Sequence, residues 1–261
     1  MHEEMLLKGR RAVVTGAGRG IGRAIALHLA RAGAAVAVVA RSKSQIESTA
    51  AEIQRDGGSA WAVVVDVTSD ESVNSAFPVI REALGGPVDT LVNNAGAYTA
   101  RTFLDYSMDD WHSLLDVNVL GTVRMTRKFL PEMLSLPRAR IINLASIAGK
   151  KASFGQSAYN ATKHALIGIT RCLALETGAS NLRVNAVCPG FTKTEMIDID
   201  QLSQVHGKSP EDLWRDIENT STIRRTVSLD EIASLVMFLT TAAADGINGQ
   251  SLVVDGGVVF S

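Results

Sequence analysis

Apolar and polar residues alternate along this chain with two different periods. Short runs rich in Val, Ile and Ala, such as 35–40, are followed by longer segments in which apolar residues recur every three to four positions, such as 43–56. This alternation is typical of repeated strand–helix–strand units and of a parallel sheet. It predicts strands near 11–15, 35–40, 60–65, 88–92, 139–145, 182–187 and 250–254, and helices near 20–32, 43–56, 69–84, 109–134, 157–178 and 228–241.

The pattern predicts an α/β fold, a doubly wound Rossmann-type parallel sheet of seven strands with helices on both faces. The 261 residues, 46% of them hydrophobic, suffice for one large core, so we expect a single domain over 1–261. The alternation lapses at about 191–223, where Met196, Leu213 and Trp214 are mixed with polar residues. Because such a long segment without a strand is usually functional or mobile, we interpret it as a substrate lid containing one or two short helices.

Charge and composition narrow the class of partner. A formal net charge of -1 without a Lys/Arg block argues against binding to nucleic acid or to an anionic membrane. Residues 1–5 lack the features of a secretion signal, and the longest apolar run, 34–40, is too short to span a bilayer. The two cysteines, Cys172 and Cys188, indicate neither a disulfide framework nor a metal site. We therefore expect a cytoplasmic protein that acts on a small molecule without a metal.

A glycine-rich turn follows the first predicted strand. Residues 15–22 read T-G-A-G-R-G-I-G and lead into an Ala-rich helix, which is the context that a dinucleotide site requires. Glycines allow backbone N–H groups to approach a pyrophosphate, whose charge the helix N-terminus favours. The spacing is G-x-x-x-G-x-G, because Ile21 occupies the third position of the usual motif. A structural tight turn is the alternative for this motif alone.

The end of the second strand indicates which dinucleotide is bound. About 20 residues past the glycine turn, where an NAD-binding protein has an acidic residue, this chain has Ala40 followed by Arg41. A guanidinium pairs with a 2′-phosphate, and Arg19 could add a second positive charge. We therefore favour NADP(H) over NAD(H); the alternative is that Arg41 and Lys43 are solvated charges. Asp66 and the segment Asn93-Asn94-Ala95-Gly96 follow the next strands and would complete an adenine and ribose site.

Candidate catalytic residues converge on the same crevice. The fifth strand delivers Ser146, and Tyr159 and Lys163 are four residues apart, so they lie on one helical face. A tyrosine of pKa about 10 needs help to act as acid and base near neutral pH, and a nearby ammonium lowers that pKa. Ser146 can hold the substrate oxygen, and Asn118 can complete a proton path through water. We expect His164 to have no role and Cys188 to be a packing residue.

Together these motifs resemble the short-chain dehydrogenase/reductase family, in its single-domain branch. The resemblance rests on T-G-x-x-x-G-x-G, N-N-A-G, Asn118, Ser146, Y-x-x-x-K, Pro189-Gly190 and Asp255-Gly256-Gly257, in this order. It implies a catalytic tetrad of Asn118, Ser146, Tyr159 and Lys163. It also implies a homotetramer formed through the helices near 109–134 and 157–178, with the choice between dimer and tetramer open. The implied cofactor-binding residues are Gly16, Gly18, Arg19, Gly20, Ile21, Gly22, Ala40, Arg41, Ser42, Asp66, Val67, Asn93, Ala95, Gly96, Tyr159, Lys163, Pro189, Gly190, Thr192 and Thr194.

The function that we expect is NADPH-dependent reduction of a carbonyl group. The residues around Phe191, Thr194 and Met196 look similar to those of 3-oxoacyl and polyketide ketoreductases, which suggests a ketone substrate, either free or linked as a thioester. One alternative is an NAD(P)-dependent hydroxysteroid, 3-hydroxybutyrate or other secondary-alcohol dehydrogenase. The other is a non-catalytic dinucleotide sensor. A basic group could contact an acyl carrier protein or coenzyme A, but we interpret it as solvated; it comprises Arg127, Lys128, Arg138 and Arg140.

Overall fold

Seven parallel strands form one sheet in the order β3-β2-β1-β4-β5-β6-β7 in the computed structural model, which describes residues 6–260. The fold class is therefore confirmed, whereas the interpretation of residues 1–5 lies outside the described residues. Strand order reverses between β1 and β4, and open α/β sheets bind ligands in the crevice at such a point. The strands are β1 (Arg11–Thr15), β2 (Ala35–Ala40), β3 (Ser59–Val64), β4 (Thr90–Asn93), β5 (Ala139–Leu144), β6 (Leu182–Pro189) and β7 (Ser251–Val254).

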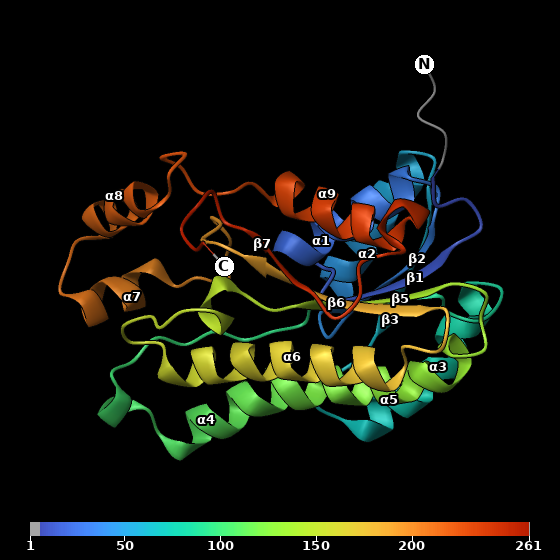
Figure 1. Cartoon of the computed structure of the whole chain (residues 1–261), viewed down its shortest axis with the longest axis horizontal. Helices are drawn as coiled ribbons and strands as arrows, with labels where there is room; N and C mark the ends of the chain where they lie inside the picture. The colour runs from blue at the N-terminus through green and yellow to red at the C-terminus, as the bar shows by residue number, and fades with distance from the viewer. Residues whose placement is uncertain (1–5, 261) are drawn as a thin grey trace.

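Helices cover both faces of the sheet (Figure 1). On one face Ile25, Ile46 and Val236 join a single apolar cluster, from α1 (Gly20–Arg31), α2 (Lys43–Arg55) and α9 (Leu229–Thr240). On the other face a second cluster holds residues of α3 (Asp70–Ala83), α5 (Gly121–Met133) and α6 (Ser157–Glu176). The central strands are buried on both sides, which explains why their sequences are nearly continuous apolar runs. Within residues 6–260 no helix combines the length and the hydropathy that a membrane span requires.

The helix predicted at 109–134 is interrupted. It consists of α4 (Met108–Leu115), a π-helical segment (Asp116–Leu120) and α5. Single π-helical turns inserted in α-helices occur frequently at functional sites. This one contains the candidate residue Asn118. Short 3₁₀ turns lie at Phe103–Asp105, Ile147–Gly149 and Ala242–Ala244.

The segment after β6 contains two short helices, α7 (Ile199–His206) and α8 (Pro210–Thr220), as the sequence predicts. Both lie beyond one end of the sheet, apart from the layered helices (Figure 1). Leu202, Leu213 and Ile217 form a small apolar cluster with Ala100, so the segment packs on the chain that follows β4. Asp198 and Ser209 cap the two helices by accepting hydrogen bonds from backbone N–H groups.

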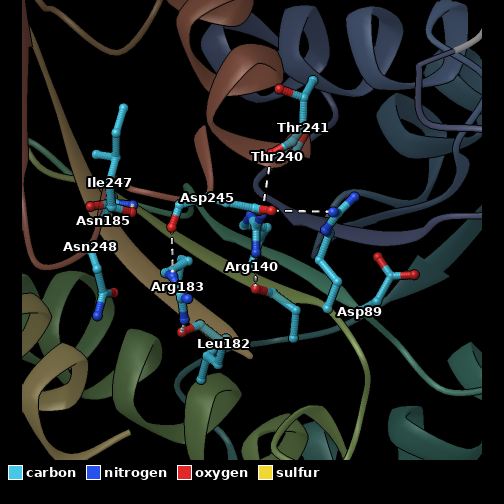
Figure 2. Close-up of polar contacts among 12 residues, drawn as sticks. Asp89, Arg140, Leu182, Arg183, Asn185, Thr240, Thr241, Asp245, Ile247 and Asn248 are labelled. Atoms are coloured by element: carbon cyan, nitrogen blue, oxygen red, sulfur yellow. Dashed lines mark hydrogen bonds and ion pairs between the residues drawn. The ribbon is translucent and has the colours of Figure 1, made fainter. Parts of the chain in front are cut away.

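An arginine cluster joins the opposite, amino-terminal end of the strands to the loop before β7 (Figure 2). Arg140 is 1% exposed, hydrogen-bonds to the Asp245 carboxylate and donates to the Thr241 carbonyl at 3.2 Å. Arg183 donates to the Asp245 carbonyl at 2.8 Å. The interpretation of the basic group as solvated is therefore wrong for Arg140, because the Asp245 loop folds over it.

Candidate active site

A cavity of about 1040 Å³ lies at the carboxyl ends of β1 to β4. Fourteen of the predicted cofactor residues line it, which brings the glycine turn together with the ends of β2, β3 and β4. They are Gly16, Gly18, Arg19, Gly20, Ile21, Gly22, Ala40, Arg41, Ser42, Asp66, Val67, Ala95, Gly96 and Thr194.

The glycine turn admits only glycine at its crowded positions. Gly16 and Gly20 have φ angles of +63° and +54°, in the left-handed region. A Cβ atom on Gly22 would lie 2.3 Å from the Gly16 carbonyl oxygen. Arg19, which precedes α1, provides no side-chain cap, and the first turn of α1 has no acidic residue. The free N–H groups of this helix end therefore fit an anionic pyrophosphate.

Asn94 attaches the glycine turn to β4. Its side-chain amide donates to the carbonyls of Thr15 at 2.9 Å and Gly16 at 3.2 Å, and its backbone N–H donates to the Thr15 hydroxyl at 2.9 Å. Asn94 is not among the cofactor-binding residues that the resemblance implies, although the N-N-A-G motif contains it. Asn93 behaves differently: its side chain is buried and donates to Thr126 and Asn143, so it lines neither cavity described in this section.

Two arginines line the large cavity in different states. Arg19 pairs with Glu195 at 2.7 Å, linking the glycine turn to the segment after β6. Arg41 is exposed, lines the cavity and makes no ion pair within residues 6–260. Asp66 accepts two hydrogen bonds from Thr68, which lower the pKa of its carboxyl together with a weaker attraction to Arg41. The unpaired guanidinium of Arg41 is therefore the group best placed to bind an added phosphate.

A second, narrow cavity of about 90 Å³ lies beside the first, and both include Thr194. Ser146 and Tyr159 line it, as do the predicted residues Pro189, Gly190 and Thr192. Apolar side chains also line it, among them Phe191, Met196 and Ile197. The two candidate catalytic hydroxyls thus open into a mainly apolar pocket next to the dinucleotide-sized cavity.

Tyr159 and Ser146 contact each other. Ser146 lies two residues beyond the end of β5 and caps the turn Ile147–Gly149, accepting from the Ala148 N–H at 3.1 Å. Burial raises the pKa of Tyr159 to about 12, and a hydrogen bond with Ser146 opposes this rise. Burial outweighs any lowering of this pKa by Lys163, so the effect expected from Lys163 stays a prediction. At neutral pH the phenol is protonated and can act as a proton donor.

Lys163 lies on the same face of α6 as Tyr159, but its ammonium group is held elsewhere. Its Nζ atom donates to the Leu144 carbonyl at 2.8 Å and lies 5.5 Å from the centre of the Tyr159 ring. The side chain lines neither cavity, and burial lowers its pKa to about 8. The ammonium form still predominates at neutral pH.

Asn118 fixes the position of neighbouring segments. Its side-chain amide donates to the Ala97 carbonyl and to the Thr162 hydroxyl, both at 3.0 Å, and its Oδ1 accepts from the Ala97 N–H at 2.7 Å. The Thr162 hydroxyl donates to the carbonyl of Tyr159 at 2.7 Å. Asn118 therefore joins the chain after β4 to the helical turn that carries Tyr159, and its part in a proton path stays a prediction.

Sequence reasoning missed Tyr98 and Gln156, which line the narrow cavity. Tyr98 stands two residues after the N-N-A-G motif, and Gln156 three before Tyr159; these spacings were the available signals.

Cys188 is fully buried and burial raises the pKa of its thiol, which confirms its packing role. His164 is exposed, and its Nδ1 atom lies 2.9 Å from the Asn160 carbonyl oxygen.

Comparison with known proteins identifies relatives that are described as dehydrogenases or reductases. The family described as short chain dehydrogenase matches residues 10–202. The chain is 38% identical over 256 residues to the 3-oxoacyl-(acyl-carrier-protein) reductase FabG of Aquifex aeolicus, covering 98% of this chain and 99% of that protein. A structure of the actinorhodin polyketide ketoreductase with NADPH superposes with a TM-score of 0.91 at 33% identity, over 95% and 97% of the two chains. A gluconate 5-dehydrogenase from Burkholderia cenocepacia, solved with NADP and tartrate, gives 0.87 at 31% identity, over 98% and 97%.

Proposed function

The chain belongs to the short-chain dehydrogenases, oxidoreductases that act on CH–OH and C=O groups, and we propose that it is an NADPH-dependent reductase of a 3-oxoacyl or polyketide-type ketone. One observation carries this proposal: Ser146 and a protonated Tyr159 meet at the wall of a pocket that adjoins the dinucleotide-sized cavity. A non-catalytic dinucleotide sensor has no need of this pair of hydroxyls.

The cofactor that we propose is NADP(H). The glycine turn and the first turn of α1 would hold the pyrophosphate, and Arg41 would hold the 2′-phosphate. Ala40 supports this choice, because an acidic residue at that strand end would favour the ribose hydroxyls of NAD(H). Two of the similar structures contain NADPH or NADP, which agrees with the proposal. When bound, the nicotinamide supplies the hydride that adds to the carbonyl carbon.

The residues of this chain donate the proton and stabilise the developing negative charge. The Tyr159 hydroxyl donates its proton to the ketone oxygen as that oxygen becomes an alcohol, and the Ser146 hydroxyl hydrogen-bonds to the same oxygen. The Lys163 ammonium stabilises the phenolate that remains. Asn118 keeps the Tyr159 turn in register and would complete the path by which the proton is replaced.

The segment 191–223 would act as the lid over the substrate. Met196 and Ile197 line both cavities, and Trp214 on α8 lines the large one, so the segment contacts both proposed binding regions. Its apolar side chains favour a substrate with an apolar chain. A thioester linkage to a carrier would leave the rest of the carrier outside the narrow pocket.

We further propose a cytoplasmic homotetramer. Helix α6 packs against α4 and against the π-helical segment that leads into α5, and α6 carries Leu175, which is 85% exposed. Such side chains are candidates for burial between subunits. Both cysteines are free thiols, as suits a reducing compartment. Light scattering at micromolar concentration would test the assembly, and a monomer would contradict it.

Initial rates with NADPH test the proposed activity. The panel contains 3-oxoacyl thioesters, cyclic ketones and 3-oxosteroids, and the reverse reaction is measured with the matching alcohols and NAD⁺ or NADP⁺. We expect the highest kcat/KM for a 3-oxoacyl thioester with NADPH. Faster oxidation of a hydroxysteroid or 3-hydroxybutyrate with NAD⁺ would replace the proposal by the dehydrogenase alternative.

A further inference from the structure

The hydroxyl of Tyr98 has an unusual environment in the narrow cavity. Tyr98 lies after β4, and its ring packs edge-on against the ring of Tyr159, with centroids 5.0 Å apart and an interplanar angle of 78°. Its hydroxyl oxygen is buried and has no hydrogen-bond partner within residues 6–260. Buried hydroxyls are nearly always hydrogen-bonded, so this one is available to a molecule that enters the cavity.

A comparison with Tyr106, eight residues later, shows what a structural tyrosine looks like in this region. The Tyr106 hydroxyl donates to the Thr99 carbonyl at 2.6 Å and approaches the Gly155 carbonyl at 3.3 Å, and it lines neither cavity. Tyr98 lines the cavity beside Ser146 and Tyr159 and has no such partner. The contrast indicates that the Tyr98 hydroxyl serves a ligand rather than the fold.

The chemistry of the pocket restricts what that ligand group can be. Burial raises the pKa of Tyr98, so its hydroxyl stays protonated and can donate a hydrogen bond. Ser146 and Tyr159 are already assigned to the oxygen of the reacting ketone. Because the ring of Tyr98 packs against that of Tyr159, a group bound by its hydroxyl would belong to a part of the substrate near the reacting ketone. An acceptor oxygen close to the reacting carbonyl is the complementary group.

We infer that Tyr98 is a specificity residue whose hydroxyl donates a hydrogen bond to a second carbonyl oxygen of the substrate, one methylene away from the ketone that is reduced. This inference rests on the proposed ketone reduction and narrows its substrate class to 1,3-dicarbonyl compounds such as 3-oxo esters and thioesters. A simple ketone would leave the Tyr98 hydroxyl unpaired in the complex.

Tyr98→Phe tests the inference, because it keeps the ring against Tyr159 and removes only the hydroxyl. Ethyl 3-oxobutanoate and cyclohexanone are compared at saturating NADPH. We expect kcat/KM for the 3-oxo ester to fall by about 10-fold to 100-fold, the range for a substrate acceptor left unpaired, and kcat/KM for cyclohexanone to change less than about twofold. Tyr106→Phe is the matched control and should leave the ratio of the two substrates unchanged. Equal losses for both substrates, or no loss, would overturn the inference.

A binding measurement separates this inference from the proposed function. In a Tyr159→Phe background, which blocks turnover, calorimetry gives the dissociation constant of ethyl 3-oxobutanoate with and without Tyr98→Phe. Weaker binding by about 10-fold or more on loss of the Tyr98 hydroxyl supports the subsite, even if the wild-type protein reduces no ketone and the proposed function fails. Equal binding, or none in either protein, refutes the subsite even if ketone reduction is confirmed.

Discussion

Replacing Arg41 by Ala should weaken the use of NADPH and leave the use of NADH nearly unchanged. Arg41 is exposed at the rim of the large cavity and makes no ion pair within residues 6–260, whereas Arg19 already pairs with Glu195. Arg41 can therefore turn to a 2′-phosphate without breaking an ion pair. NADH lacks that phosphate, so it gains nothing from the guanidinium.

The size of the effect follows from the exposure of Arg41. Hydrogen bonds to charged groups contribute about 1.5–3 kcal/mol, but exposed ion pairs contribute only about 0.2–1 kcal/mol. A phosphate at the rim of a cavity lies between these cases, so we expect its interaction with Arg41 to contribute about 1–2 kcal/mol to NADPH binding. This corresponds to a loss of about 5-fold to 30-fold in kcat/KM for NADPH. Adding Ala40→Asp should increase the shift toward NADH, because a carboxylate repels the phosphate and binds ribose hydroxyls.

The assay measures kcat/KM for NADPH and NADH with one ketone in the wild type, Arg41→Ala and Arg19→Ala. Lys43→Ala is the matched control, since Lys43 is exposed, two residues from Arg41, and 3.8 Å from Glu47. An unchanged NADPH-to-NADH ratio in Arg41→Ala, together with a reduced ratio in Arg19→Ala, would show that Arg19 binds the phosphate and that our reasoning is wrong.

Three further predictions concern pH, stability and the lid. Burial lowers the pKa of Lys163 to about 8, so kcat/KM for NADPH in ketone reduction should decline as the pH rises through about 8, where the ammonium is lost. Tyr159, with a pKa of about 12, stays protonated over this range. A flat profile up to pH about 10 would contradict the role of Lys163. Asp245→Asn should lower the free energy of unfolding by about 1–3 kcal/mol in chemical denaturation, less than for a fully buried pair because Asp245 is half exposed. Asp230→Asn is the exposed control, and equally small effects of both substitutions would contradict the importance of the Arg140 contact. Shortening the segment between Met196 and Ile217 should raise KM more for bulky ketones than for small ones, and equal increases would argue against a specificity lid.

The course of the sheet could be predicted because buried parallel strands have a distinctive sequence. The runs at 11–15 and 35–40 match β1 and β2 residue for residue, since apolar β-branched residues stop where the glycine turn and Arg41 begin. Strand β6 extends two residues beyond its predicted end, to Pro189, because Cys188 and Pro189 pair with β7. The π-helical segment around Asn118 could not be predicted, because its sequence has ordinary helical periodicity.

Much of the candidate site could also be predicted, because motif spacing fixes which residues reach the carboxyl ends of the strands. Properties that depend on three-dimensional surroundings could not. The pKa of Tyr159 is governed by burial and not by Lys163, whose ammonium group is held by the Leu144 carbonyl. Arg140 looks like a surface charge in the sequence, yet a loop more than 100 residues later buries it. Tyr98 lies in no motif, and only the cavity shows that its hydroxyl is available.

The central claim is that Tyr159 supplies the proton for reduction of a ketone bound next to the cofactor cavity. Tyr159→Phe removes only the phenolic hydroxyl, and turnover of a 3-oxo ester is measured beside NADPH affinity, the latter by quenching of protein fluorescence. We predict a loss of kcat of at least about 100-fold, the lower range for general acid catalysis, with NADPH affinity within about threefold of the wild type. Near-normal kcat in this variant would contradict the account.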